Sequence, residues 1–348
     1  MIEEILGRVS AGEDLALDEM ASTIEAIMRG DCSDSEIGLL LTALRAKGET
    51  ASEIAGAATA MRKVMVPVRY EGGGLLDTCG TGGAGSGTFN ISTAAAIVTA
   101  AAGVPVAKHG NRSITSKTGS ADVLEVLGIN VDADVATIEK CLAEVSIGFC
   151  FAPHMHPAMR HVSAVRRQLG FPTIFNLLGP LCNPAGAPFQ VLGVGRPEVH
   201  DILAEALAQL GTERSVTVCG ADGLGEVTLS GPTHVIEVGR SVTGGNRLAS
   251  GEGEMKRYQW TPDDFGLPTS SLDDIQVENA RESAAMIQEV LSGSPGTARD
   301  IVVLNAAAGI WTTGKETDLP TAAALAQEAI DSGAARDTLA RWGELSKA

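Results

Sequence analysis

A change of pattern near residues 66–75 is the strongest constraint on what this chain can fold into. Before it, apolar residues recur at helical spacing, and after it, short apolar runs end in glycine-rich loops followed by helices. Strands that alternate with helices predict an α/β fold with a mostly parallel sheet. In such sheets, ligands bind in the loops at the carboxyl ends of the strands. We therefore expect a small N-terminal helical domain over residues 1–66 and a larger α/β domain over residues 72–348 that carries the ligand site.

Helix ends are clearly marked in the N-terminal part. Ser33 stands three residues before Glu36, which is the spacing of a capping box, and Gly48 stands where the following helix end should fall. The bundle is either a docking module or a packing subdomain, and the sequence favours neither. A stretch rich in Gly and Pro near residues 166–190 is where we expect the chain to return and complete this domain.

The α/β part yields a series of expected elements. A strand should end near Asp77, and the helix after the following loop should have Ser92 as its N-cap. The other expected elements are strands at 104–108, 215–219 and 234–238 and helices at 92–102, 121–127 and 201–210.

The charge of the chain restricts its partners. It has 43 acidic and 26 basic residues, a formal net charge of -17. Such a surface repels phosphate backbones and anionic membranes, so we expect neither nucleic acid nor a membrane as a partner. An anionic substrate then needs a local cationic pocket. The acidic start of the chain, the lack of a spanning apolar stretch and six cysteines without a CxxC pair lead us to expect a cytoplasmic protein.

The strongest local signal is the segment DTCGTGGAGSGTFNIST at residues 77–93. Glycine accounts for 41 of the 348 residues, against an average of about 7%. Because this loop joins a strand to a helix start, its amides converge on a concavity suited to phosphate or diphosphate. It is not a Walker A loop, since no Gly-Lys-Ser/Thr follows, and it lacks the dinucleotide spacing. Ordinary turn chemistry remains the alternative for the loop taken alone.

A second loop, KHGNR at residues 108–112, follows the next expected strand and leads to another helix start near residue 120. A local positive field would come from Lys108, Arg112, nearby hydroxyls and a helix N-terminus, although the net charge of the chain is negative. Cations in a loop are usually solvated. Their position beside the glycine loop favours a phosphate site instead.

Five segments in the same order and spacing resemble the anthranilate phosphoribosyltransferase family: GTGG, TFNISTAAA, KHGNR, GSADVLE and TIFNLLGPLCNP. The resemblance runs over essentially the whole chain. It implies a nucleoside phosphorylase-like fold and a homodimer that contacts through the helical domain. The activity it implies is transfer of the phosphoribosyl group from phosphoribosyl diphosphate to the amine of anthranilate. The products would be N-(5-phosphoribosyl)anthranilate and diphosphate, in tryptophan biosynthesis.

The resemblance also implies site residues, carried over position by position. No side chain has to act as a nucleophile, so no catalytic residue is expected. An Arg guanidinium suits a carboxylate, which gives Arg166 a physical reason beyond the resemblance. The anthranilate residues would be Gly80, His109, Asn111 and Arg166. The phosphoribosyl diphosphate residues would be Gly80, Gly83, Thr88, Asn90, Ile91, Ser92, Thr93, Lys108, Gly110, Asn111, Ser116 and Ser120.

Magnesium is the cofactor that the resemblance implies, with Ser92 and Glu226 as its ligands. The family usually reads GTGGD and DGLDE, whereas this chain has Ala84 and Gly225 in place of two of those acids. Their loss weakens the case for a second metal ion, because Mg²⁺ prefers carboxylates together with substrate phosphates. Asp222 is an alternative ligand if its loop shifts, and water is another.

Two other functions remain in view. A pyrimidine nucleoside phosphorylase-like enzyme would share the fold, but the KHGN segment argues against it. A non-catalytic or metal-altered phosphoribosyl-binding paralogue is motivated by Ala84 and Gly225. The histidines at 154, 156 and 161 look like a metal cluster, but their spacing matches no familiar zinc site, so we interpret them as packing residues.

Overall fold

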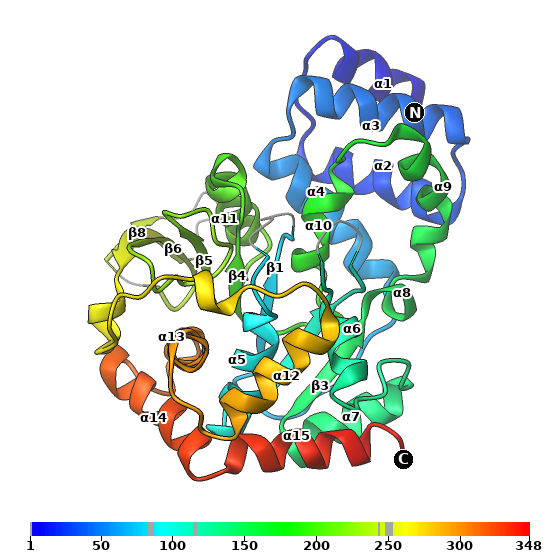
Figure 1. The fold of residues 1–348 in the computed structure, drawn as a ribbon. Coiled ribbons are helices and arrows are strands. Elements are labelled where there is room, and N and C mark those ends of the chain that lie inside the picture. The colour runs from blue at the N-terminus through cyan, green and yellow to red at the C-terminus, as the bar shows by residue number, and fades with distance from the viewer. Residues whose placement is uncertain (1, 83–86, 114–116, 243, 248–252) are drawn as a thin grey trace.

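The computed structural model describes residues 2–82, 87–113, 117–242, 244–247 and 253–348. Two expected site residues, Gly83 and Ser116, lie outside these ranges, as does Ala84. Figure 1 shows a small helical part and a larger part built on a sheet, as the alternation of patterns predicted.

Four helices form the N-terminal part: α1 (Ile2–Ser10), α2 (Leu17–Arg29), α3 (Asp34–Lys47) and α4 (Ala51–Val64). Ser33 caps α3 through a capping box with Glu36, and Gly48 ends that helix, as predicted. Helices α2 and α4 pack against each other at Gly56, where an added Cβ would lie 2.3 Å from the backbone oxygen of Leu17.

Two later helices pack on this bundle, α9 (Arg160–Leu169) and α10 (Phe175–Leu178), whereas the short helix α8 (Ala152–Met155) contacts β3 (Ile147–Phe151). Helix α9 contacts α2 and α3, and α10 contacts α4 (Figure 1). Val165 and Phe175 lie in the same buried apolar cluster as residues of α2 and α3. The N-terminal bundle is therefore joined by a segment far away in the sequence.

The larger part is built on a sheet with the order β3-β2-β1-β4-β5-β6-β8-β7 in the described residues. The strands β3, β2, β1, β4 and β5 are parallel, while β6, β8 and β7 add antiparallel pairs. This agrees with the predicted, mostly parallel sheet. The strands are β1 (Leu76–Gly80), β2 (Val106–Gly110), β3 (Ile147–Phe151), β4 (Phe189–Gly193), β5 (Arg214–Gly220), β6 (Thr233–Gly239), β7 (Asn246–Arg247) and β8 (Glu254–Trp260).

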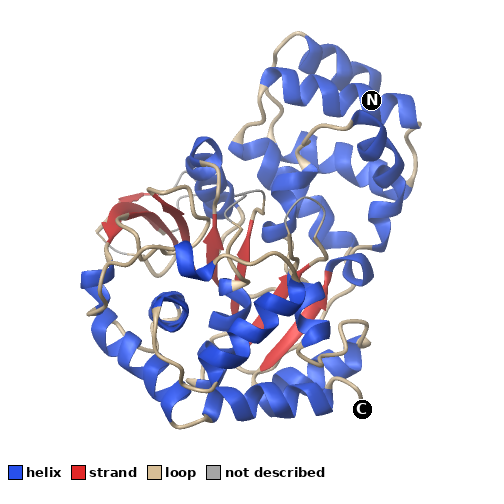
Figure 2. Ribbon diagram, viewed as in Figure 1, coloured by secondary structure: helices blue, strands red, loops and turns tan. Residues whose placement is uncertain are grey.

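Helices cover the sheet on both faces (Figure 2). Helix α13 is buried along most of its length and packs on α5, as expected for a helix that is apolar on all sides. None of the helices in the described ranges is long and apolar enough to cross a membrane. The helices of this part are α5 (Ile91–Ala101), α6 (Ser120–Val126), α7 (Val135–Val145), α11 (His200–Gln209), α12 (Ala280–Leu291), α13 (Thr297–Thr312), α14 (Leu319–Asp331) and α15 (Ala334–Leu345).

One predicted helix start is wrong. Helix α5 has Asn90, not Ser92, at its N-cap, so Ser92 lies in the first helical turn. The Asn90 side chain makes no capping bond, because its Oδ1 accepts hydroxyl protons from Thr118 and Ser283. The shift leaves both the amide and the hydroxyl of Ser92 available to partners in the site.

The contact at Gly56 gives a test of the helical packing. Gly56→Ala should lower the free energy of unfolding by about 1–3 kcal/mol, because the new methyl group meets backbone rather than a flexible side chain. Gly7→Ala in α1 is the matched control: nothing lies within 4 Å of its Cβ, so it should be neutral or stabilising by up to about 1 kcal/mol. Urea unfolding followed by circular dichroism measures both. Equal effects would contradict the close α2–α4 contact.

Candidate active site

The two expected phosphate loops meet at the carboxyl edge of the parallel strands. Strand β1 ends at Gly80 and lies between β2, which ends at Gly110, and β4, which ends at Gly193. The register aligns Gly80 with Gly193. The first turns of α5 and α6 follow β1 and β2, so most of the described residues expected to bind phosphoribosyl diphosphate lie along this one edge (Figure 1).

Lys108 lies at the centre of this edge. Its side chain is buried, and its Nζ donates to the backbone oxygen of Thr78 at 2.7 Å and to Ser92 Oγ at 3.3 Å. Burial lowers the pKa of Lys108, and the carboxylates of Asp77 and Glu226 oppose that change. An ammonium in such a place is tolerable only when it is hydrogen-bonded and paired. The strand thus fixes a positive charge beside the start of α5.

Glu226, in the loop after β5, faces the first turn of α5. The backbone amide and the hydroxyl of Ser92, together with the charge of Lys108, act to lower the pKa of this carboxyl group. Burial raises the pKa of Glu226 to about 7, although these contacts oppose the rise. The loop approaches β4 so closely that a Cβ on Gly193 would lie 1.8 Å from the backbone oxygen of Gly225. Glycine at 193 is therefore needed for Glu226 to reach the site.

The oxygens of Ser92 and Glu226 fit a magnesium ion, which prefers carboxylate, hydroxyl, phosphate and water ligands. Asp222, the alternative ligand if its loop shifts, is engaged elsewhere in this structure. Its carboxylate accepts hydrogen bonds from the hydroxyls of Thr228 and Ser230, at 2.7 and 2.6 Å. In the described part of the chain, no three His, Cys, Asp or Glu side chains are grouped to hold a metal. A magnesium ion here would take its other ligands from phosphate and water.

The second loop packs tightly, and one of its cations is neutralised. A Cβ on Gly110 would lie 2.2 Å from Ser120 Oγ, and that hydroxyl donates to the Asn111 backbone oxygen at 3.3 Å. Arg112 was expected to add free positive charge. It instead forms a two-pronged ion pair with Glu125, at 2.6 Å for each contact. Of the two expected cations, only Lys108 points its charge toward the α5 start.

The remaining expected phosphate residues take different places. Ile91 and Thr93 lie in the first turn of α5, but their side chains are buried, so only their backbone groups can meet a phosphate. Thr88 lies just before that turn, in an isolated bridge with Gln276.

His109 lies on the other face of β2 from Lys108, next to a second buried histidine. Its Nδ1 lies 3.0 Å from the Gly179 backbone oxygen, and its Nε2 lies 3.2 Å from Nε2 of His156. Because a carbonyl oxygen can only accept, Nδ1 of His109 carries the proton and its Nε2 accepts from His156. Burial lowers the pKa of His109 to about 3 and that of His156 to about 4. Both rings are therefore neutral at neutral pH.

Arg166 projects from α9 toward α10. Its Nη2 donates to Asn176 Oδ1 at 3.4 Å, and its Cζ lies 5.7 Å from the centre of the Phe175 ring. Partial burial lowers the pKa of Arg166. Within the described residues, no carboxylate forms an ion pair with this guanidinium. It is thus a cation with its charge uncompensated.

A buried polar network that the sequence does not predict lies next to His109. Asp77, fully buried in β1, accepts from the His109 backbone N–H and from Gln190 Nε2, both at 3.3 Å. Gln190 also donates to the Pro180 backbone oxygen at 2.6 Å. Burial raises the pKa of Asp77. The one available signal was a carboxylate within an apolar strand.

The three histidines that resembled a metal cluster face different partners. His154 Nε2 lies 3.5 Å from Asp132, His156 contacts His109, and the ring of His161 packs against Gly30. The segment therefore packs against three separate parts of the protein.

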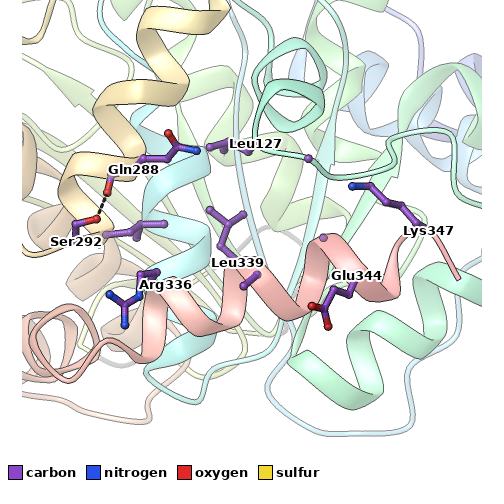
Figure 3. A pocket seen from close by; sticks show the side chains of 11 residues that line it. Leu127, Gln288, Ser292, Arg336, Leu339, Glu344 and Lys347 are labelled. Atoms are coloured by element: carbon purple, nitrogen blue, oxygen red, sulfur yellow. Dashed lines mark hydrogen bonds between the residues drawn. The ribbon is translucent and has the colours of Figure 1, made fainter.

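A groove of about 630 Å³ lies away from these residues, between α12 and α15 (Figure 3). Leu291 and Leu339 lie in its lining, together with Arg336 and Lys347. None of the expected site residues lines it. Volume alone therefore does not locate the active site.

Comparison with known proteins decides the family. Residues 3–65 match the glycosyl transferase family helical bundle domain, and residues 72–336 match the glycosyl transferase family a/b domain. The anthranilate phosphoribosyltransferase of Rhodopirellula baltica is 48% identical over 333 residues, which cover 96% of this chain and 94% of that protein. This chain belongs to the anthranilate phosphoribosyltransferase family.

Solved anthranilate phosphoribosyltransferases share its fold. The Thermus thermophilus protein has a TM-score of 0.89 and 41% identity, with 99% of both chains covered. The Saccharomyces cerevisiae protein in complex with PRPP and Mg has a TM-score of 0.87 and 28% identity, with 99% of this chain and 98% of that chain covered. The same yeast protein in complex with 4-fluoroanthranilate has a TM-score of 0.85 and 27% identity, with 100% of this chain and 99% of that chain covered. The predicted fold is thus confirmed, and the chain is a glycosyltransferase-family enzyme.

The neutral histidine pair predicts a loss of stability in acid. Its pKa values of about 3 and 4 lie below the ordinary 6.5, so the unfolded chain binds more protons at intermediate pH. The free energy of unfolding should fall as pH falls from about 6.5 to about 4. His156→Gln should reduce the slope of the free energy of unfolding against pH by up to about 1.4 kcal/mol per pH unit. Urea unfolding across that range measures it, and an unchanged slope would count against a buried neutral pair.

Proposed function

We propose that this enzyme transfers the phosphoribosyl group of phosphoribosyl diphosphate to the amine of anthranilate, as a step of tryptophan biosynthesis. The observation that carries the proposal is the presence of two cations, Lys108 and Arg166, at the candidate site of an acidic protein. Lys108 is buried beside the α5 start, where phosphates bind favourably, and Arg166 has no ionic partner among the described residues. A diphosphate and a carboxylate are the two anions of this reaction.

The chemistry is a displacement at C1 of the ribose. The amine nitrogen attacks C1, the bond from C1 to the diphosphate oxygen breaks, and the nitrogen gives up a proton. Positive charge develops on the ribose and negative charge on the leaving group, so the protein must position the reactants and stabilise these charges. Lys108 and the amides of α5 stabilise the leaving group in this scheme, without any covalent intermediate on a side chain.

We assign the individual residues in accordance with this scheme. The residues of 80–93 and 108–120 named above bind the phosphoribosyl diphosphate, and Gly80, His109, Asn111 and Arg166 bind anthranilate. Ser92 and Glu226 would hold Mg²⁺, which supplies electrostatic stabilisation of the diphosphate when bound. The fit of their oxygen ligands supports this assignment, and the yeast relative was solved with PRPP and Mg.

We further propose a cytoplasmic homodimer that contacts through the helical domain, without a nucleic acid or membrane partner. The net charge of -17 supports the last point. The domains would be residues 1–66, completed by a segment near 166–190, and residues 72–348. The contacts of α9 and α10 with the N-terminal helices support this division.

The direct experiment is a turnover assay. Purified protein is mixed with anthranilate, phosphoribosyl diphosphate and graded Mg²⁺, and the loss of anthranilate fluorescence is followed. Magnesium-dependent turnover is expected. No turnover at any Mg²⁺ concentration, with ligand binding retained, would favour the non-catalytic paralogue instead.

Arg166 provides a test of the acceptor site. Arg166→Ala should raise KM for anthranilate by about 10- to 100-fold, because a hydrogen bond to a charged group contributes about 1.5–3 kcal/mol. KM for phosphoribosyl diphosphate should change little. Arg167→Ala is the matched control, since its exposed side chain is the next one on α9. Steady-state kinetics with each substrate varied measures both, and an unchanged KM for anthranilate would remove Arg166 from the acceptor site.

Glu226 gives a separate test of the metal site. Glu226→Gln keeps the shape of the side chain but removes the carboxylate, so the Mg²⁺ concentration at half-maximal activity should rise by about tenfold or more. Glu205→Gln, on the exposed side of α11, should leave the magnesium dependence as it is. Magnesium titrations of initial rates compare the two. The same midpoint in both variants would exclude Glu226 as a ligand.

A further inference from the structure

The side-chain partner of Arg166 is uncharged. Two other partly buried arginines are paired with carboxylates, Arg214 with Glu237 and Arg299 with Asp331, whereas Arg62 donates to the backbone oxygen of Leu181. The chain has 43 acidic residues to choose from. Arg166 is held instead by the uncharged amide of Asn176, and within the described residues no acid pairs with it. Asn176 therefore contacts the guanidinium of Arg166 and leaves its charge free.

Asn176 lies in the short helix α10, and its orientation is determined by two donors. Its Oδ1 accepts the backbone N–H of Thr173 at 2.9 Å and Nη2 of Arg166 at 3.4 Å. Both partners can only donate, so the oxygen rather than the nitrogen of the amide must face them. The ring of Phe175 lies beside the same guanidinium. The side chain of Arg166 is thus held by two consecutive residues of α10.

The other end of this segment is anchored to the sheet. The backbone oxygen of Gly179 lies at hydrogen-bond distance from His109 Nδ1, and that of Pro180 accepts from Gln190. His109 lies on β2 and Gln190 on β4. The carbonyls that follow α10 are therefore fixed relative to the strands, and Asn176 is held between this anchor and Arg166.

We propose that Asn176 is a positioning residue for acceptor recognition: it orients the guanidinium of Arg166 without neutralising it, which reserves the positive charge for a carboxylate on the acceptor. A carboxylate at position 176 would orient Arg166 equally well, but it would compete with the acceptor for the same charge. Because the amide is uncharged, it does not compete with the acceptor carboxylate for Arg166, and it thereby adds to specificity. This inference rests on the proposed function, in which Arg166 binds the carboxylate of anthranilate.

The test uses two variants whose effects should rank differently. Asn176→Asp has nearly the same shape and keeps an oxygen for the Thr173 N–H, so the melting temperature should stay close to that of the wild type. Asn176→Ala loses that hydrogen bond and should melt at a lower temperature. Anthranilate affinity, measured by its fluorescence, should fall about tenfold or more in Asn176→Asp and less in Asn176→Ala. Asn176→Asp should thus be the more stable of the two variants but bind anthranilate more weakly.

A second ligand separates charge from shape. 2-Aminobenzamide has a carboxamide where anthranilate has a carboxylate, so the preference for anthranilate over this compound should shrink about tenfold in Asn176→Asp. The affinity for phosphoribosyl diphosphate should be unchanged. Affinities that follow stability, or an equal loss for both acceptors, would show a merely structural role and overturn the proposal.

Failure of the proposed function gives a different result. Wild-type protein that binds anthranilate but does not turn it over would contradict the proposed enzyme activity while the binding comparison still decides the role of Asn176. Normal turnover with unchanged anthranilate affinity in Asn176→Asp would overturn the role of Asn176 alone. Wild-type protein that binds no anthranilate would contradict both.

Discussion

The buried ammonium of Lys108 is the interaction on which the rest of the site depends. A lone charge in that position would be costly, so the surrounding elements have to supply its partners. Strand β1 offers the backbone oxygen of Thr78, α5 offers the hydroxyl of Ser92, and the loop after β5 brings the carboxyl group of Glu226. These are the same elements whose ends form the edge proposed to bind the phosphates. In a chain of net charge -17, this arrangement gives an anionic substrate a local positive field.

Side chains alternate between the two faces of a strand, and this alternation separates the proposed phosphate site from the proposed acceptor site. Lys108 and His109 are neighbours in β2, so their side chains point to opposite faces of the sheet. One side chain meets the start of α5, and the other meets His156 and the carbonyl of Gly179. In the proposed reaction, a single short strand thereby contributes to both the phosphate site and the acceptor site. The neutral histidine pair and the free charge of Arg166 make the acceptor side suitable for an aromatic ring that carries a carboxylate.

Much of the fold followed from local sequence signals, because capping boxes and the alternation of strands and helices act over a few residues. The cap of α5 did not, since the Asn90 side chain is held by Thr118 and Ser283, two residues distant in sequence. The same holds for the site. The glycine loops and Lys108 could be located from their positions after strands. The neutralisation of Arg112 by Glu125 and the bond from Arg166 to Asn176 could not, because they depend on how separate elements pack.

The central claim is that Lys108 creates the binding site for the diphosphate group. The most direct measurement is isothermal titration of phosphoribosyl diphosphate, with Mg²⁺ present, into wild-type protein and Lys108→Met, with anthranilate titrated in parallel and folding checked by circular dichroism. The account predicts that Lys108→Met binds phosphoribosyl diphosphate about 10- to 100-fold more weakly, with anthranilate affinity nearly retained. Undiminished binding of phosphoribosyl diphosphate by the folded variant would contradict it.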